Sequence, residues 1–362
     1  MRRHWQREPL LLRGAFPAFA DPLSPREVLR LACDADATAR LVQRRGRKWT
    51  LEHGPFAPSR WRTLPKRDWT VLVQDTNHVS AKADALLARF DFIAHSRIDD
   101  VMVSYAVPGG GVGPHVDSYD VFLLQGHGRR RWQISRQRDL DCVPGLPLRV
   151  LERFRPEEEW VLEAGDMLYL PPGVAHHGVA ETECLTWSIG LRAPSDTEIA
   201  RGLLDFLHDD VDLAGHYGDA GARPTRRPGE IPEDFVAHVA RVARQVRWSA
   251  PQLRELAGRL LSEPRPQVFF SPPARPLAAA AFVASARRHG IALDRRTRLL
   301  SSRGHFFING EAVEAPASAR AALRRLSDAR RLEPGDRAAA TFWPLAHAWY
   351  RQGFLDISLE AP

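Results

Sequence analysis

Three side chains with the chemistry of metal ligands lie in two short motifs that are well separated in the sequence. His115 and Asp117 form a His-x-Asp pair after a glycine-rich segment, and His176 follows a Pro-Pro-Gly turn. In an extended strand, residues two positions apart point to the same side, so the first two side chains can reach one ion. Two imidazoles and one carboxylate on one side of an iron ion are the ligands of non-haem iron oxygenases, and they leave coordination positions open.

Two adjacent histidines end the second motif, and only one of them can be a ligand, because neighbouring residues in a strand face opposite ways. The Pro-x-Gly-x-x-His spacing from Pro171 selects His176 and leaves His177 a supporting or surface role. Each motif alone also occurs in ordinary turns and on ordinary surfaces. Their combination, in this order and with strands between them, favours the metal site.

A run of three arginines in Gly128–Trp132 offers a partner for a carboxylate. Strand alternation would turn Arg130 to the face opposite Arg129 and Arg131. A 2-oxo acid could occupy two open positions on the metal and dioxygen the third, and one inward arginine could bind the second carboxylate as a bidentate pair. We therefore predict iron(II) as the cofactor, 2-oxoglutarate and O2 as cosubstrates, and Arg130 as the carboxylate clamp.

Many short strands surround these motifs. β-branched and aromatic residues cluster between glycines and prolines, which predicts strand. A series of short strands without helices between them favours a closed or double-layered antiparallel barrel. We expect an α+β fold whose first part is a double-stranded β-helix (cupin-like) barrel. The predicted strands are residues 69–74, 101–106, 121–125, 130–134, 160–163, 167–170 and 184–191.

Helical patterns precede and follow the barrel. Ser24 to Glu27 form a capping box with proline at the first helical position, and residues 80–92 have apolar positions at helical spacing. Asn309-Gly310 after an apolar run marks a hairpin. We predict a catalytic domain at 1–194, a helical region at 195–266 and an α+β, winged-helix-like domain at 267–362. The later helices are expected at 196–207, 235–246, 249–264, 277–288 and 318–329.

The length of 362 residues suits two or three domains, and 44% hydrophobic with 26% charged residues is typical of globular proteins. No apolar run approaches the roughly 20 residues of a membrane span, and Leu10 to Leu12 are too few for a signal-peptide core. The three cysteines form no Cys-x-x-Cys motif. We expect a cytoplasmic protein without a membrane partner.

The formal net charge is +7 and the pI about 9.8, and lysine occurs only at positions 48, 66 and 82. Arginine binds phosphate well, which would suit a nucleic-acid or ribosomal partner. The same arginine bias fits a GC-rich coding genome. The overall charge therefore leaves both explanations open.

Two stretches, VPGGGVGPHVDSYDVFLLQGHGRRRW and LYLPPGVAHHG, resemble the bacterial ribosomal oxygenases of the JmjC superfamily. The similarity runs in order over essentially the whole chain, including that family's helical dimerisation region and winged-helix domain. It implies 3-hydroxylation of an arginine in a large-subunit ribosomal protein. By position, it implies that His115, Asp117 and His176 are the catalytic iron ligands, and that Arg130 and Ser104 hold 2-oxoglutarate.

A substrate guanidinium beside a dicationic metal needs compensating negative charge, because an unpaired buried charge is costly. Asp120, just beyond the His-x-Asp pair, is the predicted substrate carboxylate. The position after the distal histidine is often acidic in the family but is His177 here. The role of this position in the family therefore cannot be assigned to His177.

The expected partners are a ribosomal protein and a second copy of the chain. Residues 235–246 and 253–261 have more apolar surface than one small domain needs, which favours an isologous homodimer. Competing functions are a ribosomal histidine hydroxylase, a small-molecule oxygenase and a nucleic-acid-binding regulator with a cupin sensor. Residues 318–331 contain basic residues but no obvious base-reading amides, so direct nucleic-acid binding is open but not expected.

Overall fold

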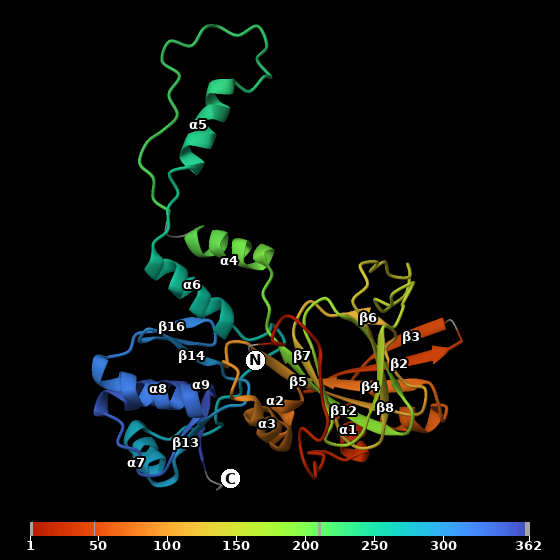
Figure 1. Ribbon diagram of the computed structural model, residues 1–362. Coiled ribbons are helices and arrows are strands. Elements are labelled where there is room, and N and C mark those ends of the chain that lie inside the picture. Colours follow the sequence, from red (N-terminus) through yellow and green to blue (C-terminus); the bar gives the residue numbers. More distant parts are fainter. Residues whose placement is uncertain (1–2, 47, 209–210, 359–362) are drawn as a thin grey trace. The chain divides into compact units, whose positions relative to one another are not determined.

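The computed structural model describes residues 3–46, 48–208 and 211–358, and the chain divides into two compact units, 1–193 and 194–362 (Figure 1). The first two residues of the predicted catalytic domain and the last four of the predicted C-terminal domain lie outside the described residues. No helix within the described ranges combines the length and apolar character needed to cross a membrane.

An antiparallel sheet of eight strands forms one wall of the first unit, in the order β1-β10-β7-β12-β5-β4-β2-β3. Side chains along its central strands alternate between two apolar layers, because successive residues face opposite sides. Val121 and Leu123 enter the barrel core, whereas Phe122 and Leu124 pack on the other face. The strands are β1 (Leu10–Leu12), β2 (Thr38–Arg45), β3 (Lys48–His53), β4 (Trp69–Gln74), β5 (Ile98–Ala106), β7 (Val121–Gln125), β10 (Met167–Leu170) and β12 (Cys184–Leu191).

A second antiparallel sheet, in the order β6-β11-β8-β9, forms the opposite wall. Trp132 and Ile134 of this sheet share one core with Leu168 and Leu170 of the larger sheet, so the two sheets enclose the barrel interior. The double-stranded β-helix is therefore confirmed. The strands are β6 (His115–Val116), β8 (Arg130–Ser135), β9 (Glu158–Leu162) and β11 (Ala175–Ala180).

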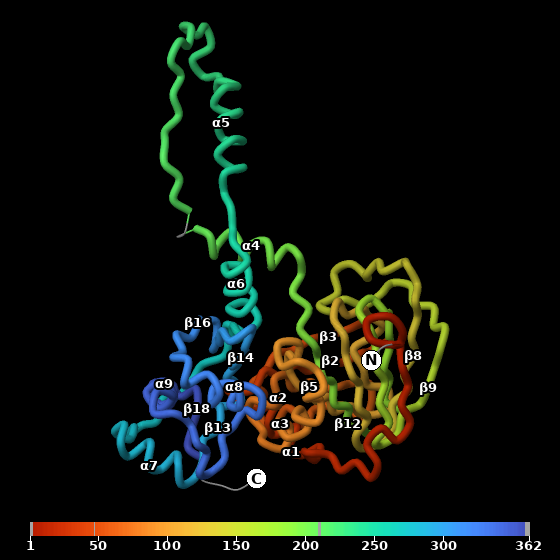
Figure 2. Tube along the Cα trace, turned by 60° about the vertical axis from the view of Figure 1, so that its left-hand side comes forward, coloured from red at the N-terminus to blue at the C-terminus, as the bar shows by residue number. Residues whose placement is uncertain are grey.

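Helices α1 (Pro25–Leu31), α2 (Thr76–Val79) and α3 (Ala81–Leu87) belong to the outer layer of the large sheet, and Figure 2 shows α2 and α3 beside β5. The capping box that starts α1 is present, with the Ser24 hydroxyl accepting from the amide of Glu27 and the Glu27 carboxylate accepting from the amide of Ser24. The predicted helix at 80–92 is shorter than expected. It ends at Leu87 and continues as a 3-10 turn over Ala88–Phe90.

All the strands that the sequence predicted in the barrel are confirmed, with small differences at their ends. Two causes explain the strands of this unit that were missed. β2, β3 and β11 contain charged residues, histidines or glycine, and none has the apolar run on which the prediction depended. β1 and β6 have only three and two residues.

The second unit contains six helices and two small sheets among its described residues. Phe282, Phe306 and Phe342 are fully buried in its core. The predicted hairpin is confirmed, since Asn309 and Gly310 take positive φ values of 49° and 89° between β15 and β16. Its elements are α4 (Asp196–His208), α5 (Glu233–Ala243), α6 (Ala250–Ser262), α7 (Ala279–His289), α8 (Arg320–Ala329), α9 (Trp343–Gln352), β13 (Ile291–Leu293), β14 (Leu299–Ser302), β15 (His305–Ile308), β16 (Glu311–Val313), β17 (Arg331–Leu332) and β18 (Leu355–Ile357).

Candidate metal centre

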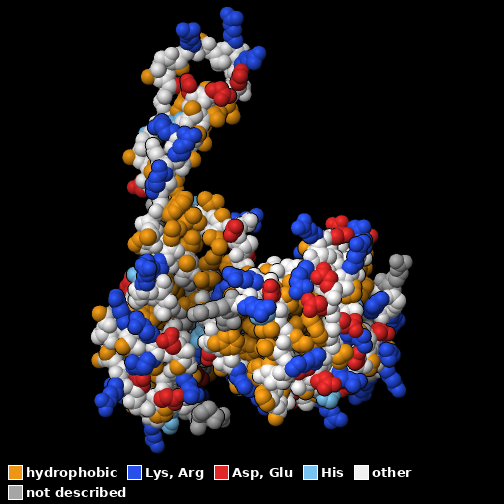
Figure 3. All heavy atoms as spheres, in the orientation of Figure 1, with side chains coloured by type: hydrophobic (Ala, Val, Ile, Leu, Met, Phe, Trp, Pro, Cys, Tyr) orange, Lys and Arg blue, Asp and Glu red, His pale blue; other side chains and the backbone are white. Residues whose placement is uncertain are grey.

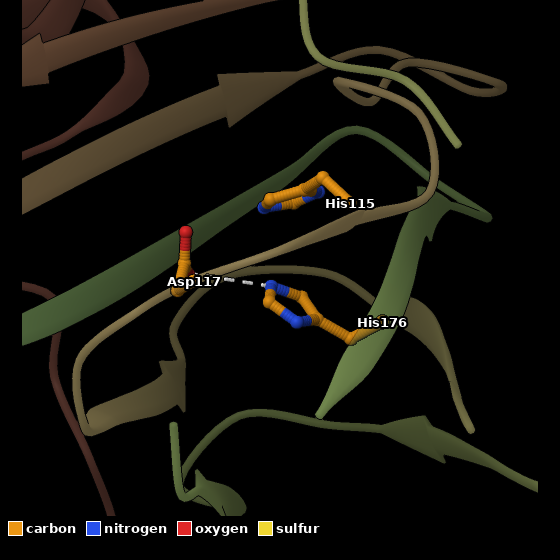
Figure 4. A group of neighbouring side chains, drawn as sticks. All are labelled: His115, Asp117 and His176. Carbon is orange, nitrogen blue, oxygen red and sulfur yellow. Dashed lines mark ion pairs between the residues drawn. The ribbon is translucent and has the colours of Figure 1, made fainter. Parts of the chain in front are cut away.

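The two candidate metal-binding motifs meet in the small sheet. β6 and β11 pair antiparallel, with His115 directly opposite His176. The candidate ligand atoms of His115, Asp117 and His176 all lie within 4.8 Å of one another (Figure 4). Oδ2 of Asp117 is 3.6 Å from Nε2 of His176, and the two imidazole centroids are 4.2 Å apart. The structure therefore brings together the three residues that the sequence selected.

Backbone carbonyls fix the orientation of both imidazoles. Nδ1 of His115 is 2.9 Å from the carbonyl oxygen of Gly113, and Nδ1 of His176 is 3.0 Å from that of Val174. A carbonyl can only accept, so each Nδ1 carries the proton in this arrangement. Each Nε2 then has a free lone pair, which is the tautomer that a metal ligand needs.

Burial sets the charge state of the centre. Burial, reinforced by the charge of His115, lowers the pKa of His176 to about 3, so this imidazole is neutral at ordinary pH. Burial also raises the pKa of Asp117, and the neighbouring His115 opposes that shift. A neutral His176 imidazole beside a desolvated carboxylate makes a site that a divalent cation would stabilise.

Glycines allow the loop before His115 to pass close to its neighbours. A Cβ atom on Gly110 would lie 2.1 Å from the carbonyl oxygen of Trp69, and one on Gly111 would lie 2.4 Å from that of Gly178. No other residue type fits at these two positions without moving the backbone. The loop therefore packs between β4 and β11 and delivers His115 opposite His176.

Arg130 points into the barrel and is 5% exposed. Its Nη1 donates to Oγ of Ser104 at 3.1 Å, while Nε and Nη2 are buried without a hydrogen-bond partner among the described residues. Its guanidinium carbon lies 5.7 Å from the ring centroid of Trp132, whose ring is 5.9 Å from that of His176. Buried donors without partners are rare and point to a missing acceptor. A carboxylate between Arg130 and the metal centre meets that requirement.

Three side chains near the centre were not found from the sequence. Tyr119 donates to the carboxylate of Asp117, and burial together with the charges of Asp117 and Asp100 raises its pKa. Asp100 is buried on β5 opposite Gly190, where a Cβ would lie 3.0 Å from its Oδ1. The charge of Arg40 on β2 acts on Asp117 and Tyr119. No motif marks these residues, and β2 itself was missed.

Asp120 lies in a different environment from the triad. Its side chain is fully buried, and its carboxylate accepts from the Tyr169 hydroxyl at 2.5 Å, from Arg97 at 3.0 Å and from the Gln6 amide at 3.0 Å. This network ties the chain that follows Asp117 to β10 and to the N-terminal segment. The predicted contact of Asp120 with a substrate stays a prediction.

His177 turns away from the triad, as strand alternation requires. Its ring meets that of Phe154 edge-on, with centroids 6.0 Å apart. Burial lowers the pKa of His177 to about 4, and the charge of Arg44 contributes. The imidazole is therefore neutral and packed against Phe154, in contrast to the acidic residue that the family often has at this position.

The chain matches two family models: a JmjC domain over residues 85–199 and a ROXA-like winged helix over residues 245–356. It is 33% identical over 319 residues to the ribosomal protein uL16 3-hydroxylase of Escherichia coli, covering 87% of this chain and 85% of that protein. It is 40% identical over 87 residues to the bifunctional lysine-specific demethylase and histidyl-hydroxylase NO66 of Dictyostelium discoideum, covering 22% of this chain and 16% of that one.

Among solved structures, the chain is similar to YcfD, a ribosomal oxygenase from Escherichia coli, in complex with cobalt and 2-oxoglutarate. The TM-score is 0.83 at 30% identity, and the match covers 98% of this chain and 96% of that one.

Proposed function

The chain belongs to the bacterial ribosomal oxygenases of the JmjC superfamily, and we propose that it is an iron(II)- and 2-oxoglutarate-dependent hydroxylase of an arginine in a large-subunit ribosomal protein. The observation that carries the proposal is the His115, Asp117, His176 cluster in one barrel with Arg130, whose guanidinium keeps two unpartnered nitrogens. We place the protein in the cytoplasm, where ribosomal proteins are made and assembled.

In this proposal His115, Asp117 and His176 hold iron(II), and Arg130 and Ser104 bind the remote carboxylate of 2-oxoglutarate. The bound iron would supply the activation of dioxygen that inserts one oxygen atom into a C–H bond while 2-oxoglutarate is decarboxylated to succinate. The protein's own part is positioning. The backbone carbonyls of Gly113 and Val174 hold the imidazoles in the ligating tautomer, and Tyr119 orients the carboxylate of Asp117.

An arginine target is supported by the carboxylates near the centre. Asp100 lies on the face of β5 that also carries Ser104, and a Cβ on Gly190 would lie 4.0 Å from the Tyr119 ring and 3.0 Å from Asp100. A side chain at Gly190 would therefore crowd the Asp100 carboxylate and approach the Tyr119 ring, and glycine avoids this contact. A guanidinium pairs with a carboxylate and stacks on an aromatic ring, so this acidic and aromatic pair supports an arginine target. The name of the Escherichia coli relative supports uL16 as the target protein and carbon 3 as the hydroxylated position.

Turnover of 2-oxoglutarate with peptides from large-subunit ribosomal proteins tests the proposal. We expect decarboxylation coupled to a gain of one oxygen atom on an arginine of the uL16 peptide. Mass spectrometry of ribosomal proteins from a deletion strain should show the loss of that increment. If the mass of one oxygen atom were lost from a histidine instead, histidyl hydroxylation, which the name of NO66 includes, would be favoured.

We also propose that the protein is a homodimer joined through its helical region. None of the residues of α5 is buried, and Phe235, Val236 and Val239 of this helix are each at least 41% exposed. Figure 3 shows apolar side chains gathered over α4 and α6, where Leu204 is 70% exposed. Apolar patches of this kind are usual at obligate interfaces. Light scattering should give about twice the chain mass of 40.7 kDa, and a monomer at micromolar concentration would contradict the dimer.

A further inference from the structure

Positive charge in the first unit is concentrated in one part of the sequence. Residues 40–68 contain nine Lys or Arg and two Asp or Glu, whereas the rest of residues 1–193 contains 18 basic and 22 acidic residues. Two of the three lysines of the chain, Lys48 and Lys66, lie in this segment. An arginine-rich genome does not explain a local excess of this size that also includes lysine.

The fold gathers these charges at one end of the β2–β3 hairpin. Arg45 pairs with Lys48 across the hairpin, and the amide of Arg44 donates to the carbonyl of Asp68 at 2.9 Å, which brings Lys66 and Arg67 beside it. We call Arg44, Arg45, Lys48, Lys66 and Arg67 the basic face. All five are exposed, and Figure 3 shows Lys and Arg side chains at this edge of the first unit.

The basic face has little internal compensation. Within the described residues, the ion pairs of the first unit include Arg60 with Glu52 at 2.6 Å but none that involves a member of the basic face. Asp68 is the acidic residue next to it in the sequence. Solvent-exposed cations in a cluster repel one another, so the face creates a positive potential that an anionic partner would relieve.

The same face adjoins the loop that carries His115. The guanidinium of Arg44 lies 5.5 Å from the ring centroid of Trp49, and a Cβ on Gly113 would meet the Trp49 ring at 3.2 Å. A ligand on the basic face would therefore lie beside the metal centre.

We propose that the basic face binds phosphates of ribosomal RNA, so that the enzyme recognises its target side chain together with neighbouring RNA. This inference rests on the proposed function for the identity of the RNA. A cationic target alone would be repelled by the face, whereas RNA supplies the opposite charge. Arginines that bind phosphate bidentately, with a partly exposed tryptophan beside them, form the kind of surface that proteins use for RNA backbones and stacked bases.

Binding of the full-length protein to a fluorescein-labelled hairpin from large-subunit ribosomal RNA tests the inference, by anisotropy at several salt concentrations. The test variant is R45Q/K48Q/K66Q/R67Q, which avoids every residue placed at the metal centre. The control is R303Q/R320Q/R324Q/R337Q, which removes the same charge from exposed arginines of the second unit. Thermal melting confirms that both variants are folded.

We expect the test variant to bind at least about 10-fold more weakly than wild type at 100 mM salt, with a salt slope smaller by about 3, because each lost phosphate contact removes roughly 0.7–0.9 from the slope. The control should stay within about threefold of wild type. Equal losses in both variants, or equally tight binding of polyglutamate by wild type, would overturn the inference.

A second measurement separates this inference from the proposed function. Hydroxylation of a short uL16 peptide should be the same in wild type and in the test variant, while hydroxylation of uL16 bound to ribosomal RNA should fall in the variant alone. If wild type modifies no ribosomal peptide but binds the RNA hairpin through the basic face, the proposed function fails and RNA binding stands. If both substrates are modified equally well by the variant, the RNA inference fails and the proposed function stands.

Discussion

Neighbouring arginines on the inner and outer faces of β8 differ in their partners. On the outer face, Arg131 pairs with Glu159 at 2.6 Å and with Glu181 at 2.5 Å, and Arg129 lies 3.7 Å from Glu181. On the inner face, Arg130 is buried with one hydroxyl partner and two unpartnered nitrogens among the described residues. Carboxylates thus pair with the arginines on either side, whereas within the described residues no carboxylate pairs with Arg130.

The outer arginines form ion pairs within the protein, whereas the inner arginine is available to a ligand. Exposed ion pairs contribute little to stability, and their loss is tolerated. A buried guanidinium that lacks an acceptor destabilises the protein alone, so its presence is explained by an acceptor that arrives with a ligand. The same contrast holds for Asp117, which lies beside the neutral imidazole of His176, and Asp120, whose carboxylate has three protein donors.

The largest effect is expected at the metal centre. Asp117→Ala removes the anionic ligand of the cluster. Changes to groups that only support a ligand cost about 10–100-fold in metal affinity, so loss of a ligand should cost more than about 100-fold. Titration with cobalt(II) measures the affinity, and Asp141→Ala, at an exposed aspartate, is the control. Unchanged cobalt affinity in Asp117→Ala would remove this residue from the site.

Arg130→Ala should leave the metal site intact and weaken 2-oxoglutarate. Loss of one partner of a buried charge pair costs about 3–5 kcal/mol, which corresponds to roughly a 100- to 4000-fold rise in the KM for 2-oxoglutarate. Cobalt affinity should stay within about threefold of wild type. Arg130→Lys keeps the charge but loses the planar fork, so high 2-oxoglutarate should restore part of the activity. If the alanine substitution left this KM unchanged, Arg130 would not bind 2-oxoglutarate, and the inner and outer arginines would not differ in function.

Asp120→Asn tests whether a carboxylate with protein partners also serves the substrate. Weakening its bonds to Tyr169 and Arg97 should lower the free energy of unfolding by about 1.5–3 kcal/mol and the melting temperature by roughly 4–10 °C. The KM for an arginine peptide, measured well below that temperature, decides its second role. A substrate contact requires this KM to rise, and a lower melting temperature with unchanged KM would leave Asp120 a purely structural role.

The sequence predicted the barrel and its candidate metal triad because both depend on local patterns. Short apolar runs between glycines and prolines identified β7, β10 and β12 at their observed ends, and the spacing from Pro171 chose His176 over His177. Asp100 and Arg40 could not be found in this way, because they meet the centre only through the pairing of strands distant in the sequence. Tyr119 is only two residues from Asp117, but no motif marks it. β2 and β3 were missed because neither has the apolar run on which the prediction of strands depended.

The smallest effects are expected on the outer face of β8. Arg129→Ala and Arg131→Ala remove side chains that are about half exposed and point away from the barrel, so each variant should keep at least about half of wild-type activity on a short peptide. The ion pairs with Glu159 and Glu181 are screened by solvent, and removing them leaves each glutamate hydrated rather than buried. Steady-state decarboxylation with saturating 2-oxoglutarate measures the effect, and circular dichroism confirms folding. Because Arg130 lies between these two residues, the three alanine variants form a matched set that differs only in the direction of one side chain. Equal loss of activity in all three would show that the inner and outer faces do not differ in function, and the assignment of Arg130 to the carboxylate of 2-oxoglutarate would fall with it.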